Sequence, residues 1–201
     1  MKTTPMSLAA LLVSLAACVT TSSPPPEELA NELITTLDEG KTDEARERFE
    51  RVEHDAEYRD KIYPVLFGAA RRRYLEGNGA GAAVLLRFLH EGYPDAVAVR
   101  EALVYSMFLE RASVEHPDPA LTVELEQLLA EMRATEGPLP VWVDLIEAQQ
   151  GIDRGDTEGA RAAYERFVAS WDRRPGDPVL EVYVDDIGRY LTTGTESESR
   201  R

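Results

Sequence analysis

The chain has 201 residues, of which 37 are Asp or Glu and 22 are Lys or Arg, so its formal net charge at pH 7 is -15. This acidic excess argues against nucleic acid or an anionic membrane surface as the main partner, because both attract positive charge. The only cysteine is Cys18, which excludes an intramolecular disulfide and a cysteine-based zinc site. We expect no metal, no other cofactor and no small-molecule substrate.

Residues 1–17 have the features of a secretory signal peptide. Lys2 provides a positively charged start, residues 8–17 form a short apolar run, and Ala16 and Ala17 are the small residues expected before a cleavage point. The apolar run is shorter than the roughly 20 residues that a membrane-spanning helix needs. The alternative interpretation is an ordinary signal peptide followed by a chance cysteine.

The segment Leu15-Ala16-Ala17-Cys18 resembles the lipobox of bacterial lipoproteins. The resemblance implies cleavage before Cys18, a diacylglyceryl thioether on its sulfur and acylation of the new amino terminus. Each buried methylene adds about 0.8 kcal/mol of anchoring, so several acyl chains hold a protein stably on a membrane. Because Val19 and not aspartate follows Cys18, the pattern is similar to that of outer-membrane lipoproteins. We expect the protein on that membrane, facing the periplasm.

Residues 18–26 read Cys-Val-Thr-Thr-Ser-Ser-Pro-Pro-Pro and are predicted to form a polar, proline-rich tether. Anionic lipid headgroups repel an acidic body, so tether and charge together favour a domain held away from the membrane. At the other end, residues 193–201 are polar and are expected to form a disordered tail.

Residues 27–192 are predicted to form one all-α domain. Apolar residues recur at helical spacing, and Gly or Pro interrupts them at short intervals. Short turns between amphipathic helices produce antiparallel helix pairs. We expect about four pairs and a C-terminal capping helix over 178–191, whose apolar stripe is Leu180, Tyr183, Val184, Ile187, Tyr190 and Leu191.

Three glycines recur at nearly constant intervals, 37 residues apart and then 78, which is twice 39. Each is expected to end the first helix of a pair, because glycine tolerates the backbone conformation that stops a helix. An alanine five residues later is expected to let the second helix approach closely. The copies are Gly40 with Ala45, Gly77 with Ala82, Gly155 with Ala160, and a degenerate copy at Glu115 with Ala120 and Glu124.

The segment from Gly155 to Ala160, followed by Tyr164 and Phe167, resembles the turn and second helix of the tetratricopeptide repeat. The family repeat is about 34 residues long, whereas the interval here is 37–40. The resemblance implies a right-handed α-solenoid of helix hairpins whose first helices line a concave groove. An unrelated helical bundle is the alternative. Further residues that match the repeat are Gly77, Asn78, Ala82, Leu86, Leu89 and Pro94.

The repeat register places eight candidate partner-binding residues on the groove, although the register over 97–135 stays open. Aromatic and arginine side chains anchor partner segments, whereas the alternative places the aromatic residues in the core. Arg71, in the run Arg71-Arg72-Arg73, is the candidate for binding an acidic or carboxylate-ended peptide. At least one arginine of the run is expected to pair with acidic neighbours such as Glu44 or Glu47. The eight residues are Phe67, Arg71, Tyr74, Tyr105, Phe108, Trp142, Leu145 and Gln149.

The sequence contains no Gly-x-Ser-x-Gly, His-Glu-x-x-His or phosphate-loop motif, so we predict no catalytic and no metal-binding residues. We predict a membrane-anchored lipoprotein that acts as a protein-protein interaction scaffold or adaptor in the bacterial cell envelope. In outline it is similar to the repeat lipoproteins of outer-membrane barrel assembly and pilus assembly. The alternative is a helical periplasmic enzyme or an enzyme accessory subunit.

Overall fold

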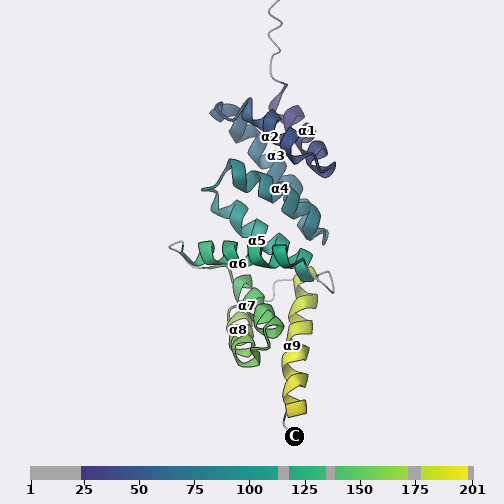
Figure 1. Cartoon of the computed structure of the whole chain (residues 1–201), viewed down its shortest axis with the longest axis vertical. Helices are drawn as coiled ribbons and strands as arrows, with labels where there is room; N and C mark the ends of the chain where they lie inside the picture. The colour runs from purple at the N-terminus through teal and green to yellow at the C-terminus, as the bar shows by residue number, and fades with distance from the viewer. Residues whose placement is uncertain (1–23, 113–117, 135–138, 172–177, 199–201) are drawn as a thin grey trace, which may run out of the picture.

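The structure is a computed structural model that describes residues 24–112, 118–134, 139–171 and 178–198. The predicted signal peptide and Cys18 lie outside these ranges. The described residues form nine helices and no strand, which confirms the all-α prediction (Figure 1). The helices are α1 (Pro26–Asp38), α2 (Thr42–Glu50), α3 (Ala56–Leu75), α4 (Gly79–Gly92), α5 (Val97–Ala112), α6 (Pro119–Ala134), α7 (Trp142–Asp153), α8 (Thr157–Ser170) and α9 (Pro178–Glu198).

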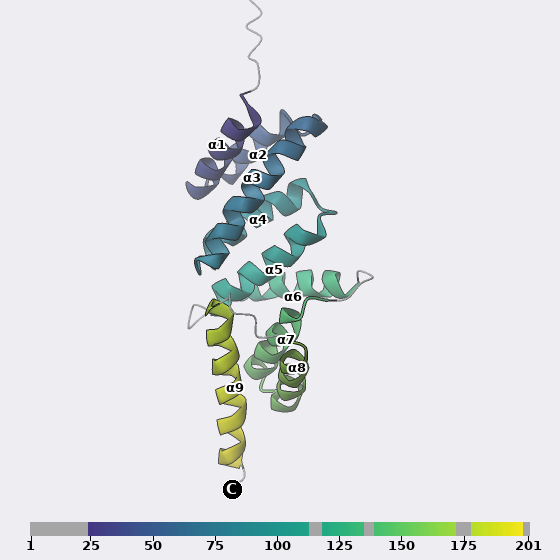
Figure 2. The same cartoon turned by 180° about the vertical axis from the view of Figure 1, so that it is seen from behind.

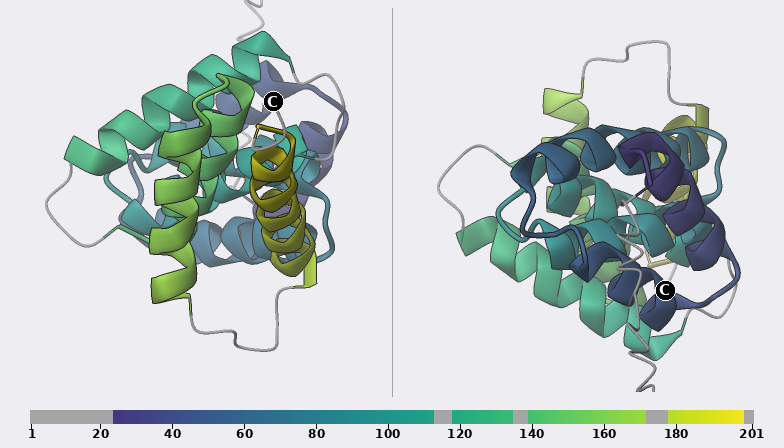
Figure 3. Two further views of the ribbon diagram at one scale, coloured as in Figure 1. Left: turned by 90° about the horizontal axis from the view of Figure 1, so that it is seen from below. Right: turned by 90° about the horizontal axis from the view of Figure 1, so that it is seen from above.

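Most helices that follow one another in the chain pack together. Within pairs, α1 packs on α2, α3 on α4, α5 on α6 and α7 on α8. Between pairs, α1 contacts α3 and α4 packs extensively on α5. Figures 1 and 2 show α1 to α6 succeeding one another along the long axis, with α7 and α8 beyond them. In Figure 3, α9 lies beside α7 and α8, both of which it contacts.

The three periodic glycines end helices as predicted. Gly40, Gly77 and Gly155 have φ of 74°, 80° and 73°, in the left-handed region that favours glycine. At the end of α1, the Lys41 N–H donates to the Thr36 carbonyl at 3.1 Å and the Gly40 N–H donates to Leu37 at 3.0 Å. The same pair of bonds closes α3 and α7. This Schellman arrangement satisfies carbonyls that a helix end otherwise leaves unpaired.

The alanines that follow these glycines are fully buried, which confirms their predicted place between packed helices. Ala45, Ala82 and Ala160 are each 0% exposed. The degenerate copy does not keep this register, because Ala120 is exposed and the next residue, Leu121, is buried. Asp118 caps α6 by accepting the Ala120 N–H at 2.9 Å. Residue 115 itself lies outside the described ranges.

The C-terminal helix differs from the expectation in two ways. Val184, Ile187 and Leu191 are buried, as their spacing predicts, but Tyr190 is 54% exposed. The helix also continues to Glu198, so the prediction of a disordered tail is wrong for residues 193–198. Thr193 donates its hydroxyl to the Arg189 carbonyl at 2.9 Å, a bond between side chain and backbone that is compatible with a continuing helix.

The folded body begins within the predicted tether. Pro25 is extended, with φ of -51° and ψ of 143°, and Pro26 starts α1, where proline is well tolerated. The Tyr58 hydroxyl of α3 donates to the Pro24 carbonyl, so the last prolines are held against the body. Among the described residues, no helix combines the length and apolar character needed to cross a membrane.

Candidate functional site

An open hollow of about 430 Å³ lies between α3, α5 and α7, which are the first helices of three successive helix pairs. Five of the eight residues predicted to bind a partner line it, namely Phe67, Arg71, Tyr74, Tyr105 and Trp142. We call this hollow the aromatic groove. Its remaining lining residues are Ala98, Glu101 and Ala102, all from α5.

Three of the aromatic side chains of the groove form one connected row. The Tyr105 ring lies between Tyr74, at 5.7 Å and perpendicular to it, and Trp142, at 5.6 Å. Phe67 stacks on Tyr63 one helical turn earlier, with ring centroids 5.6 Å apart. Edge-to-face and stacked contacts of this kind fix ring orientation. The rings therefore form a preformed surface that spans three helix pairs.

Two charged side chains of opposite sign line the aromatic groove without partners of their own. Within the described part of the chain, neither Arg71 on α3 nor Glu101 on α5 makes a hydrogen bond or an ion pair. Side chains without an internal partner keep their hydrogen-bonding capacity for another molecule. The groove thus offers one cation and one carboxylate beside its aromatic surface.

Arg71 and Arg73 of the arginine run have different surroundings. Arg73, and not its neighbours, makes the internal ion pair, and its partner is Asp38 of α1 at 2.7 Å. The expected pairing of one arginine with an acidic neighbour is confirmed, but that neighbour is Asp38 and neither of the two examples named; Glu44 instead accepts from Arg48 within α2. Since successive helical residues point about 100° apart, Arg73 faces α1 while Arg71 faces the groove.

Three of the predicted groove residues lie elsewhere. Phe108 and Leu145 are 0% exposed, so the expectation that they bind a partner is corrected. Both occupy core-facing positions of their helices, and the Phe108 ring packs on Tyr183 of α9 at 5.6 Å. Gln149 does not line the groove and instead donates to Asp153 one turn along α7, at 3.0 Å.

The sequence argument missed the contribution of α5 before Tyr105. Ala98, Glu101 and Ala102 precede that tyrosine by seven, four and three residues, which is the spacing of one helix face. Stepping back from Tyr105 along the helical period would have found them. The two alanines leave space above the helix, and that space is part of the groove.

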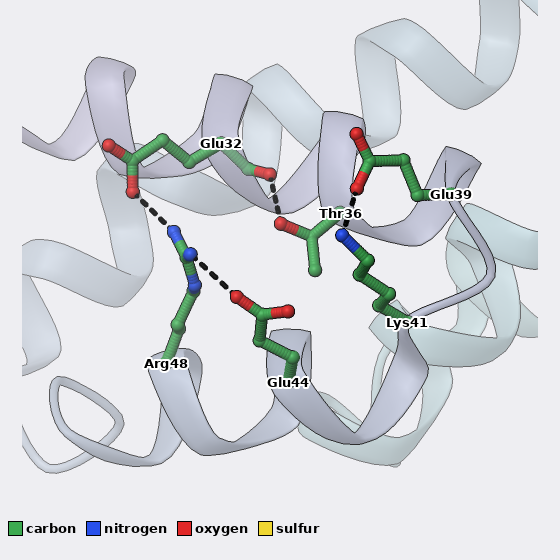
Figure 4. Close-up of polar contacts among 6 residues, drawn as sticks. All are labelled: Glu32, Thr36, Glu39, Lys41, Glu44 and Arg48. Carbon is green, nitrogen blue, oxygen red and sulfur yellow. Dashed lines mark hydrogen bonds and ion pairs between the residues drawn. The ribbon is translucent and has the colours of Figure 1, made fainter.

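A second, acidic hollow of about 780 Å³ lies between α1 and α2. Its charges are largely paired, as Figure 4 shows: Arg48 bridges Glu32 and Glu44 at 2.8 and 2.7 Å, and Lys41 pairs with Glu39 at 2.6 Å. The hydrogen bond from Arg48 lowers the pKa of Glu44. Among the described residues, no group of His, Cys, Asp or Glu is arranged to hold a metal ion.

Comparison with family models, with curated proteins and with solved structures finds no match to this chain. Its function is therefore inferred from the aromatic groove and from the leader sequence.

Proposed function

We propose that the protein is a lipid-anchored scaffold or adaptor of the bacterial cell envelope that binds an extended segment of a partner protein in the aromatic groove. The observation that carries the proposal is the convergence of Phe67, Tyr74, Tyr105 and Trp142, from three successive helix pairs, on one open hollow. These residues are far apart in the sequence, and only the stacking of the pairs brings them together.

The chemistry of the groove suits a peptide segment. Tyr and Trp present large, rigid surfaces that lose little conformational entropy on binding, and they are common anchors of protein interfaces. The guanidinium of Arg71 can hold a carboxylate of the partner through two parallel hydrogen bonds. Glu101 can pair with a Lys or Arg of the same segment. One segment that carries an apolar residue between an acidic and a basic group would meet all three features.

The helix pairs support a tetratricopeptide-like solenoid. The repeated glycine ends at Gly40, Gly77 and Gly155, and the buried alanines after them, indicate one structural unit used several times. In such arrays each unit contacts mainly its neighbours, and the first helices form an extended concave surface. The right-handed solenoid is part of the proposal and explains why the groove is open along the stack.

The anchor is tested by substituting Cys18. We expect Cys18→Ala to abolish lipidation, so that the protein leaves the membrane fraction and changes mobility on gel electrophoresis. Thr20→Ala, in the same tether, is the control and should behave like the wild type. A Cys18→Ala protein that still sediments with membranes and keeps its mobility would overturn the lipid anchor.

The groove is tested with a photoreactive amino acid placed at Ala98, which is exposed and lines the groove, and at Val123 on α6, which is 53% exposed and lies outside it. Irradiated cells are expected to give one dominant cross-linked protein from position 98 and not from position 123. Adding Arg71→Glu should reduce that product about tenfold, because a carboxylate repels the partner's carboxylate. Equal products from both positions would overturn groove binding.

A further inference from the structure

A third hollow, of about 440 Å³, lies between α6, α7 and α8, away from the aromatic groove. Three arginines line it: Arg133 from α6, Arg166 from α8, and Arg154, which directly follows the end of α7. We call it the arginine pocket. Three guanidinium groups from separate parts of the chain therefore meet at one polar hollow.

The arginines of the pocket use only some of their N–H groups in internal hydrogen bonds. Glu147 accepts from both Arg133 and Arg166, and Arg166 also donates from its Nε to Asp144 at 2.9 Å. Arg154 lies 3.6 Å from Glu126, which is too long for a hydrogen bond. Because a guanidinium carries several N–H groups and no acceptor, most of these donors keep capacity for an added oxygen.

Gln150 gives an independent indication of a ligand. Its side chain lines the arginine pocket and is only 5% exposed, yet its Nε2 has no hydrogen-bond partner among the described residues. An unsatisfied buried amide destabilises a fold, so such groups are rare unless they serve another purpose. The Gln150 amide nitrogen and the three arginine side chains are all hydrogen-bond donors, so one acceptor group could serve them together.

We propose that the arginine pocket binds a small organic anion through its carboxylate or phosphate oxygens, with Arg154, Arg166 and Gln150 as donors. The pocket is within the size range of small-molecule sites. Its ion pairs are partly exposed, and pairs in contact with solvent are weak, so a ligand oxygen can compete with Glu147 for the arginines. Glu126, Glu147 and Asp156 balance the arginines, which favours a ligand of low charge over a polyanion.

Anion binding is tested on the full chain in detergent, by calorimetry and thermal unfolding, with sodium phosphate and with sodium acetate against sodium chloride of equal ionic strength. We expect saturable binding and a raised unfolding temperature with at least one of the two anions. The anion with the lower dissociation constant shows whether the pocket prefers phosphate or carboxylate. Neither result depends on the groove or on a protein partner.

Two variants make the test specific. Arg154→Gln, at a side chain 60% exposed, should weaken anion binding at least tenfold without affecting folding. Gln150→Leu should also weaken binding, but it should raise the unfolding temperature of the anion-free protein because it removes an unsatisfied amide. Arg72→Gln, at an exposed arginine of α3, is the control and should bind like the wild type.

Three results would overturn the proposal. The first is an unfolding temperature of the wild type that neither anion changes beyond the effect of chloride. The second is equal anion binding by Arg154→Gln and the wild type, which would indicate unspecific screening. The third is a lowered unfolding temperature for anion-free Gln150→Leu, which would assign Gln150 a structural bond.

Discussion

Arg87 on α4 donates from Nε and Nη2 to the two carboxylate oxygens of Glu124 on α6, at 2.8 and 2.9 Å. The hydrogen bond that the guanidinium donates to Glu124 is the main cause of a raised pKa at Arg87. The pair joins the second helices of two successive helix pairs, and both side chains are partly buried. It is therefore a side-chain link between the second and third pairs, beside the extensive packing of α4 on α5.

A double-mutant cycle measures this connection. Arg87→Met and Glu124→Gln are expected to lower the free energy of unfolding, with a coupling of about 1 kcal/mol, because the pair is bidentate and only partly exposed. Denaturation in urea gives the four free energies. Arg72→Met, at an exposed arginine, controls for the loss of one cation. Additive effects of the two substitutions would show that the pair contributes no stability.

Replacing the helix-ending glycines tests the repeated turn. Gly77→Ala and Gly155→Ala are expected to lower the free energy of unfolding by about 1–2 kcal/mol each, because a Cβ disfavours their positive φ. Gly68→Ala is the matched control, since Gly68 lies inside α3 and an added Cβ would meet nothing within 4 Å. That change should stabilise the protein by about 0.5–1 kcal/mol. A gain in stability from Gly77→Ala or Gly155→Ala, or a loss of stability from Gly68→Ala, would contradict this account.

The sequence predicted the helix pairs well because their ends depend on local chemistry. Gly40, Gly77 and Gly155 stop helices by backbone conformation, and that information lies within a few residues. Side-chain partners were harder to predict. Glu124 was expected only as a degenerate member of the repeat, whereas its role depends on where α4 lies. The ion pair between Arg73 and Asp38 likewise depends on how the second helix pair lies against the first.

The aromatic groove was also predicted only in part, because local spacing does not show how the helices pack. Helical spacing placed Phe67, Arg71 and Tyr74 on one face of α3, and they do line the groove together. The spacing could not decide which side of α5 and α7 is covered, because both helices have apolar residues on more than one side. Phe108 was therefore predicted at the surface, although α9 covers it through Tyr183.

The two phenylalanines should respond differently to truncation. Phe108→Ala removes a fully buried ring and is expected to lower the free energy of unfolding by about 3–5 kcal/mol. Phe67→Ala removes a partly buried ring at the groove and should cost clearly less while weakening the cross-link from position 98. Urea denaturation and cross-linking yield are measured on both variants. Equal loss of stability would mean that Phe67 is a core residue.

Close helix approach offers another test. Ala82 was expected to allow close approach within its helix pair, whereas the approach of the next pair is close at Gly79: a Cβ added there would lie 2.7 Å from both the Glu110 nitrogen and the Ser106 carbonyl oxygen of α5. Gly79→Ala must push α4 away from α5, so it should cost about 1–3 kcal/mol, measured by thermal unfolding. Ala80→Gly, at the exposed neighbouring position, controls for a change at the helix start. A neutral Gly79→Ala would show that the two helices separate freely.

Tyr93 is expected to make stability fall at alkaline pH. Burial raises the pKa of its phenol above 10.0, and its hydroxyl donates to the Arg59 carbonyl at 2.9 Å. The folded state therefore favours the neutral phenol, and this contribution is present below about pH 10 and is lost as the pH rises through the folded pKa.

Tyr93→Phe should cost about 1 kcal/mol at pH 7 through the lost hydrogen bond. Its deficit should shrink above about pH 10, because phenylalanine does not ionise. Urea denaturation of the wild type and the variant at several pH values measures both effects. Tyr190→Phe, at a side chain 54% exposed, is the control and should follow the wild type. A Tyr93→Phe deficit that stays constant with pH would exclude ionisation of Tyr93 as a source of the alkaline loss.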